Sequence, residues 1–151
     1  MIKNQSLISK HAKSFNWAGF FLTKETFSKC SILYDFCRSI DDIVDGSETL
    51  SVRQKKFIEF KSNFINKNST NNIIKSIHAL LESENISKKI VEDLFDGIES
   101  DLKPVIVISN KKDLLVYSYR VAGTVGLMMA KILKVKDVYG LKGAIDLGIA
   151  M

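Results

Sequence analysis

The spacing of the large apolar residues is the feature that most limits what this 151-residue chain can fold into. Over much of the sequence they recur every three or four positions, in the runs Phe57, Phe60, Phe64; Ile73, Ile74, Ile77, Leu80, Leu81; and Ile90, Leu94, Ile98, Leu102. That period places the apolar residues of each run on one face of an α-helix. The one strand-like run, 105–108, is too short to carry a sheet by itself. The sequence therefore predicts an all-α fold.

Residues that favour helix ends mark where these helices should start and stop. Capping side chains predict starts at Thr23, Ser51, Thr70 or Asn71, Ser87 and Asn110. Stops are expected at Gly46, within 66–68 and 83–85, at the only proline, Pro104, and at Gly140. No repeat, low-complexity tract or long linker divides the chain, so one domain, or part of one, is expected.

The distribution of charge argues against a nucleic-acid partner. The net charge is +5, but only three of the 22 basic residues are arginines (Arg38, Arg53 and Arg120), and the basic residues are spread over every segment. Lysine-rich, solvated helix faces explain this pattern better than a binding groove for nucleic acid.

Two further features suggest a cytoplasmic protein. Cys30 and Cys37 lie seven residues apart in one expected helix, about 10 Å along its axis, so they could not form a disulfide. The first fifteen residues lack the continuous apolar stretch of a signal peptide.

The segment 114–133 is long enough to be tested as a membrane span. Arg120 lies within it, and a central arginine costs about 2.5 to 3.5 kcal/mol on insertion into a membrane. We therefore expect a buried helix there and no transmembrane span.

The stretch "LYDFCRSIDDIVDG", 33–46, concentrates polar groups on one side of an expected helix. At 100° per residue, one arc holds Tyr34, Arg38, Asp41, Asp42 and Asp45, and the opposite side holds Leu33, Phe36, Ile40 and Ile43. One interpretation is a solvated face on which Arg38 pairs with Asp41 or Asp42. The other is a binding site for a cation.

Electrostatics favour the cation. The aspartates lie in the last turns before Gly46, where the helix dipole disfavours each carboxylate by about 0.3 to 1 kcal/mol. They also repel one another, and a bound cation would remove both penalties. Oxygen-only ligands, with no histidine pair or cysteine cluster nearby, indicate Mg²⁺ shared with substrate phosphates rather than zinc.

Three motifs in order give the chain a specific resemblance. The segments "HAKSF" (11–15), "DFCRSIDDIVD" and "YSYRVAGTVGLMMAKIL" closely resemble the squalene/phytoene synthase family, and "VAGTVGLMMA" is most similar to its phytoene synthases. The resemblance extends along essentially the whole chain. Ala12, Thr23 and the apolar run 105–108 depart from the family pattern, but none is a proposed metal ligand.

The resemblance implies an isoprenoid (terpenoid) synthase fold and a Mg²⁺-dependent (Mn²⁺ as an alternative) head-to-head condensation of two geranylgeranyl diphosphates to phytoene in carotenoid biosynthesis. Asp41 and Asp45 would be metal ligands, with Asp42 a further candidate. Arg38 would hold diphosphate together with His11 and Ser14, and Tyr34 would line the cavity near the reacting carbons.

The resemblance also implies a prenyl channel, for which a plain helix-packing stripe is the alternative. Its lining would comprise Phe15, Val121, Gly123, Val125, Gly126, Met129, Ala144 and Leu147. Tyr117 and Tyr119 would reach diphosphate or water, or only end a helix contact. The acidic residues Asp93, Asp96, Glu99 and Asp101 spread around their helix and are interpreted as solvated.

The family's second Asp-rich motif would follow "AIDLGIAM", so the chain is expected to be the N-terminal part (1–151) of a single prenyl synthase domain, inactive alone. A complementing C-terminal fragment and peripheral association with a membrane surface are further expectations. Two alternatives stay open: a squalene or dehydrosqualene synthase, and a non-catalytic helical remnant.

Overall fold

The computed structural model describes residue 17 and the ranges 19–68, 70–105 and 107–151. Every regular element among these residues is helical, and the described part of 105–108 forms no strand. The expected site residues His11, Ser14 and Phe15 lie outside the described residues. In chain order the elements are η1 (Gly19–Phe21), α3 (Lys24–Val44), α4 (Leu50–Ile65), α5 (Asn72–Ser83), α6 (Lys88–Asp101), α7 (Lys111–Ser118), the π-helical segment η2 (Tyr119–Gly123), α8 (Thr124–Ile132) and α9 (Val138–Ala150).

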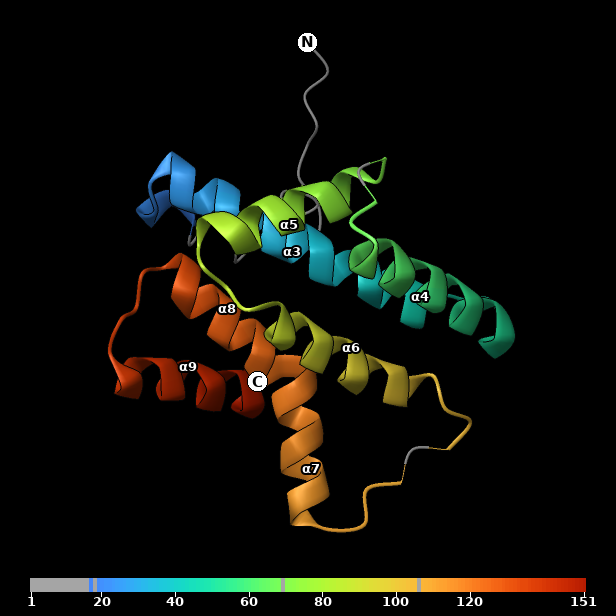
Figure 1. The fold of residues 1–151 in the computed structure, drawn as a ribbon. Helices are drawn as coiled ribbons and strands as arrows, with labels where there is room; N and C mark the ends of the chain where they lie inside the picture. Colours follow the sequence, from blue (N-terminus) through green and yellow to red (C-terminus); the bar gives the residue numbers. More distant parts are fainter. Residues whose placement is uncertain (1–16, 18, 69, 106) are drawn as a thin grey trace.

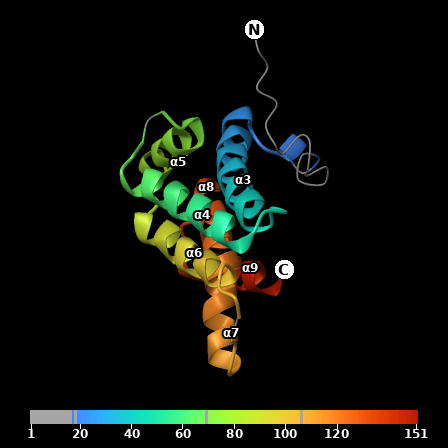
Figure 2. The same cartoon turned by 90° about the vertical axis from the view of Figure 1, so that its right-hand side faces the viewer.

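The helices form a bundle from which one short helix projects. The long helix α3 packs against α4 and α5 and also meets α8, while α6 packs against α8 and η2. The last helix, α9, lies along α8 and η2. In both views α7 extends away from the rest of the bundle (Figures 1 and 2).

Five phenylalanines join α3, α4 and α6 into one core. The ring of Phe95 on α6 lies 6.0 Å from Phe36 of α3, and 5.9 and 5.3 Å from Phe57 and Phe64 of α4, measured between centroids. Phe60 completes the cluster at 6.4 Å from Phe95. Aromatic rings at these spacings add to the stability that burial of their area provides. The predicted apolar runs therefore do face a common core.

Four of the five expected helix starts agree with the caps in the structure; the expected start at Ser51 is wrong, because α4 begins at Leu50 with Thr49 as its N-cap. Side-chain oxygens of Thr23, Asn71, Ser87 and Asn110 accept from backbone N–H groups in the first turns of α3, α5, α6 and α7. One expected stop is wrong. Gly140 lies inside the first turn of α9, where its N–H donates to Asp137 Oδ1 at 2.6 Å, so this glycine follows a helix start.

The segment 114–133 is helical without a break up to Ile132, as expected, but it contains a π segment and is not buried throughout. It comprises most of α7, the π segment η2, and α8 with its C-cap. The α7 side chains Leu114, Leu115 and Val116 are exposed, because α7 projects from the bundle, whereas α8 buries Met128 and Ile132. Among the described residues, no helix has both the length and the apolar character to cross a membrane.

A buried carboxylate ties the end of α5 to two other elements. Glu84 follows α5, and its side chain is only 1% exposed. Its Oε1 lies 2.9 Å from Lys29 Nζ of α3, and its Oε2 accepts from Lys134 Nζ, beyond the end of α8. Both lysines lower the pKa of Glu84, Lys134 most strongly, through hydrogen bonds to its carboxylate.

Candidate functional site

A cavity of about 690 Å³ lies between α3, α6, α8 and α9, and we call it the main pocket. Most of its surface is apolar. Of the residues expected to line a prenyl channel, six surround it: Val121, Val125, Gly126, Met129, Ala144 and Leu147. The structure thus brings together, from η2, α8 and α9, residues that are up to 26 positions apart in the sequence.

The carboxylates of the main pocket gather at one end, which we call the carboxylate end. Cys30 Sγ lies 3.5 Å from Met129 Sδ, so the start of α3 is level with the later part of α8. Asp41 and Asp45 lie further along α3, about 16 and 22 Å from Cys30 at 1.5 Å per residue. They line the pocket at the end away from Met129, and Asp101 of α6 lies there with them.

At the carboxylate end, neighbouring charges and burial raise the pKa values of Asp41 and Asp101. Although Asp41 is exposed, partial loss of solvent beside the apolar wall raises its pKa, and the charge of Asp45 raises it further. Burial likewise raises the pKa of Asp101, to which Asp45 adds, while a hydrogen bond from Tyr117 opposes the rise. A cation at the carboxylate end would relieve this crowding of negative charge.

Asp101 is a site residue that sequence reasoning missed. Its interpretation as a solvated residue is wrong, since it is half-buried and lines the main pocket. A signal was present: Leu94, Ile98 and Asp101 follow the i, i+4, i+7 spacing of one helix face, and all three line the pocket. An acidic residue that continues an apolar stripe is a candidate for the wall of a pocket. The other acidic residues around this helix favoured the interpretation of Asp101 as solvated.

The predicted polar arc on α3 divides into two groups. Arg38 Nη2 lies 2.7 Å from Asp42 Oδ1, and this pair is 40% and 53% exposed. Neither residue, nor Tyr34, is among the side chains that line the main pocket. The pairing is one that the solvated-face interpretation expected, and roles of these three residues in binding stay predictions.

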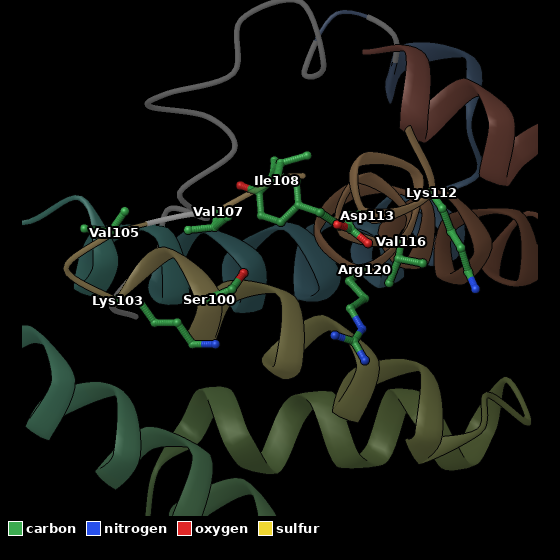
Figure 3. A pocket seen from close by; sticks show the side chains of 10 residues that line it. Ser100, Lys103, Val105, Val107, Ile108, Lys112, Asp113, Val116 and Arg120 are labelled. Carbon is green, nitrogen blue, oxygen red and sulfur yellow. The ribbon is translucent and has the colours of Figure 1, made fainter. Parts of the chain in front are cut away.

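Tyr117 lies in the wall between the main pocket and a smaller hollow. Its hydroxyl donates to Asp101 Oδ1 at 2.8 Å, and burial with this carboxylate raises the pKa of Tyr117 to about 12. Its side chain lines a cavity of about 270 Å³ between α6, α7 and the loop joining them. Figure 3 shows Lys103 near Val105 on one side of that hollow, Lys112, Val116 and Arg120 on the other, and Val107 and Ile108 between them. Tyr117 thus contacts a carboxylate of the main pocket without lining it.

Two glycines let α8 and η2 approach α9 closely. A Cβ on Gly126 would lie 2.2 Å from the carbonyl oxygen of Ala144, and one on Gly148 would lie 2.5 Å from that of Ala122. All four residues line the main pocket, so the close approach forms one of its walls. Gly123, also expected in the channel, packs instead against Ile145 and Ile149.

The donor set at the carboxylate end suits Mg²⁺ as a partial site. Within the described residues, no three His, Cys, Asp or Glu side chains come close enough together to hold a metal ion. Asp41 and Asp45 offer oxygen ligands only, and Mg²⁺ is commonly bound by one or two carboxylates with water and phosphate oxygens. These two residues therefore fit Mg²⁺ provided that other oxygens complete its coordination.

Comparison with known proteins agrees with this arrangement. A sequence model of the squalene/phytoene synthase family matches residues 8–151. A 15-cis-phytoene synthase of Pantoea ananas is 28% identical over 92% of this chain and 48% of its own length, and one from a Paracoccus species is 25% identical over 99% and 52%. A crystal structure of a dehydrosqualene synthase in complex with ligand superposes with a TM-score of 0.70 at 24% identity, covering 96% of this chain and 51% of that one.

The helical bundle, its pocket and the structural match define an all-α isoprenoid synthase fold. The chain belongs to the squalene/phytoene synthase family. It spans about half the length of the curated relatives it matches.

Proposed function

We propose that this chain binds prenyl diphosphates and takes part in a phytoene synthase-like condensation of two geranylgeranyl diphosphates. The observation that supports this most is the polarity of the main pocket, whose apolar walls lead to the carboxylate end. A prenyl diphosphate has the same polarity, with a long hydrocarbon chain and an anionic head. An anionic head beside carboxylates requires a divalent cation between them.

Asp41 and Asp45 would hold Mg²⁺, or Mn²⁺, with diphosphate oxygens and water completing its coordination. When bound, the cation supplies positive charge that stabilises a leaving diphosphate. Val121, Val125 and Met129 would hold the hydrocarbon and exclude water from the reacting carbons. Arg38, outside the pocket wall, would meet only the part of a diphosphate that reaches beyond the carboxylate end.

Binding is tested on this chain alone, by titration calorimetry with geranylgeranyl diphosphate in the presence and absence of Mg²⁺. We expect Mg²⁺-dependent binding that Asp41→Asn weakens by at least about tenfold, since a neutral amide is a poor ligand for Mg²⁺. Glu59→Gln, an exposed change on α4, is the matched control and should leave binding unchanged. Equal binding by Asp41→Asn would contradict the assignment of the ligand.

Turnover is tested by adding the C-terminal half of the Pantoea ananas relative as a complementing fragment. We expect phytoene only when both polypeptides are present, because by resemblance the family uses carboxylates from two Asp-rich motifs. Phytoene from this chain alone would overturn that view. Squalene or dehydrosqualene as the product would move the assignment within the family, and binding without any product would favour the non-catalytic alternative.

A further inference from the structure

Two adjacent residues of α4 hold the ends of the two helices that carry the pocket carboxylates. Arg53 Nη1 donates to the backbone oxygen of Val44, the last residue of α3. Gln54 Nε2 donates to the backbone oxygen of Leu102, the C-cap of α6, at 2.8 Å. We call this pair of side chains the α4 clamp.

Each bond of the clamp lies beside a carboxylate. The last carbonyl groups of a helix have no partner within the helix, so a donor from another element fixes the position of the helix end. Val44 immediately precedes Asp45, and Leu102 immediately follows Asp101. Movement of either carbonyl would therefore move a carboxylate of the main pocket.

The clamp joins two helix ends that border the main pocket. Val44 of α3 and Leu102 after α6 belong to the common buried core, and residues of both helices line the pocket beside them, so the two hydrogen bonds add a connection to the one that packing provides. The two clamp residues are consecutive. Phe57, less than one turn after Gln54, anchors α4 in the phenylalanine core against Phe95. One turn of α4 thus relates both helix ends to the same rigid core.

The contact with Val44 buries part of the Arg53 guanidinium group. Its Nε is buried and has no hydrogen-bond partner among the described residues. Burial of an unpartnered N–H group is unfavourable, so the contact with Val44 carries a cost at Nε.

We infer that Arg53 and Gln54 are positioning residues that set the spacing between Asp45 on α3 and Asp101 on α6. This spacing determines how a cation and a diphosphate fit at the carboxylate end, and that consequence rests on the proposed function. The spacing itself is a property of the fold and can be measured without any ligand.

The first measurement is the distance between spin labels placed just beyond the two helix ends. Ser47→Cys and Lys103→Cys are exposed positions for labelling, in a chain also carrying Cys30→Ala and Cys37→Ala. Gln54→Met keeps the length of the side chain but removes its donor. The distances are measured by double electron–electron resonance. We expect Gln54→Met and Arg53→Met to broaden the distance distribution. Arg53→Lys, which keeps a donor, should broaden it less.

Two controls separate positioning from loss of stability. Lys55→Met changes the next, exposed residue of α4, and Ile77→Val weakens a fully buried part of α5 away from the pocket. Neither should change the distance distribution, even where Ile77→Val lowers the urea midpoint as much as Gln54→Met does. An unchanged distribution in Gln54→Met and Arg53→Met would overturn the inference.

The second measurement connects the clamp to the site. Binding of Mn²⁺ with inorganic diphosphate is followed by the Mn²⁺ resonance signal, and Gln54→Met should weaken it by about tenfold, as loss of an outer support of a metal site does. If the parent chain does not bind Mn²⁺ with diphosphate, the proposed function fails while the distance measurement still decides on the clamp. If distances change and Mn²⁺ binding does not, the clamp has no role in positioning the site.

Discussion

At the scale of single residues, neighbours in the sequence have different surroundings. Asp41 lines the main pocket, and among the described residues the charge of Arg38 acts on it without forming an ion pair, whereas Asp42, the next residue, forms an exposed ion pair with Arg38. Helical geometry turns successive residues by 100°, which separates the two carboxylates although both belonged to one predicted arc.

This difference predicts unequal effects of the same substitution at the two positions. Asp41→Asn removes a carboxylate that is disfavoured by partial burial, by Asp45 and by the C-terminal end of α3, so it should raise the free energy of unfolding at pH 7 by about 0.3 to 1 kcal/mol. Asp42→Asn also relieves charge at this helix end, but it loses a surface ion pair worth about 0 to 1 kcal/mol, so it should raise the free energy of unfolding less than Asp41→Asn does, or lower it. Urea unfolding monitored by circular dichroism measures both. Loss of stability in Asp41→Asn would show that its carboxylate is favourably paired.

Glu84 gives a prediction that depends on pH. Glu84→Gln should lower the free energy of unfolding by about 1 to 3 kcal/mol at pH 7, because Lys29 and Lys134 lose a buried charged acceptor. The pKa of Glu84 in the folded chain lies below its usual value of 4.5, so its stabilisation is complete above pH 4.5 and is lost as the pH falls through the lowered value. Urea titrations at pH 7 and pH 3 should therefore show the difference shrinking in acid.

The matched control is Glu82→Gln, which affects an exposed pair with Lys67 at 3.6 Å. Its cost should stay within about 1 kcal/mol at both pH values. A Glu84→Gln cost that does not decrease in acid would mean that packing, and not charge, determines it.

At the scale of elements, the π segment η2 determines which residues meet the two cavities. Arg120 lines the smaller hollow, while Val121 and Ala122, the next residues, line the main pocket. Gly97 of α6 permits this, since a Cβ there would lie 2.7 Å from Cβ of Arg120. Single π turns inside α-helices are frequent at functional sites. No residue pattern in the sequence predicted this π segment, which packs against α6 and α9.

The contact between α8 and α9 is tested with two glycines that differ only in surroundings. Gly126→Ala would place a methyl group against the backbone of Ala144, and such overpacking costs about 1 to 3 kcal/mol. Gly143→Ala, on α9, meets nothing within 4 Å and should add up to about 1 kcal/mol through better helix propensity. Thermal unfolding of both variants should thus give shifts of opposite sign. A stabilised Gly126→Ala would mean that α9 can move away from α8 at little cost.

At the scale of the whole molecule, local sequence patterns predicted the helices, but they did not predict how the helices pack against one another. The apolar period of 57–102 identified α4, α5 and α6 and their buried faces, because that period is a property of each helix alone. The position of Asp101 beside Asp45 depends on how α6 crosses α3, which no local pattern contains. Likewise, capping chemistry located the start of α7, but its exposure follows from where the bundle ends.

The division of aromatic residues between core and surface determines which spectroscopic signals report the unfolding of this chain. The five clustered phenylalanines are buried, while the only tryptophan, Trp17, is 68% exposed and touches Phe21 edge-on at a centroid distance of 5.6 Å. Indole emission shifts to longer wavelength only when the ring gains water, and Trp17 is already largely hydrated. We therefore expect red-edge tryptophan fluorescence in the native chain and little shift in urea, while the helical signal at 222 nm is lost. A blue-shifted native spectrum would show that the indole is covered in solution.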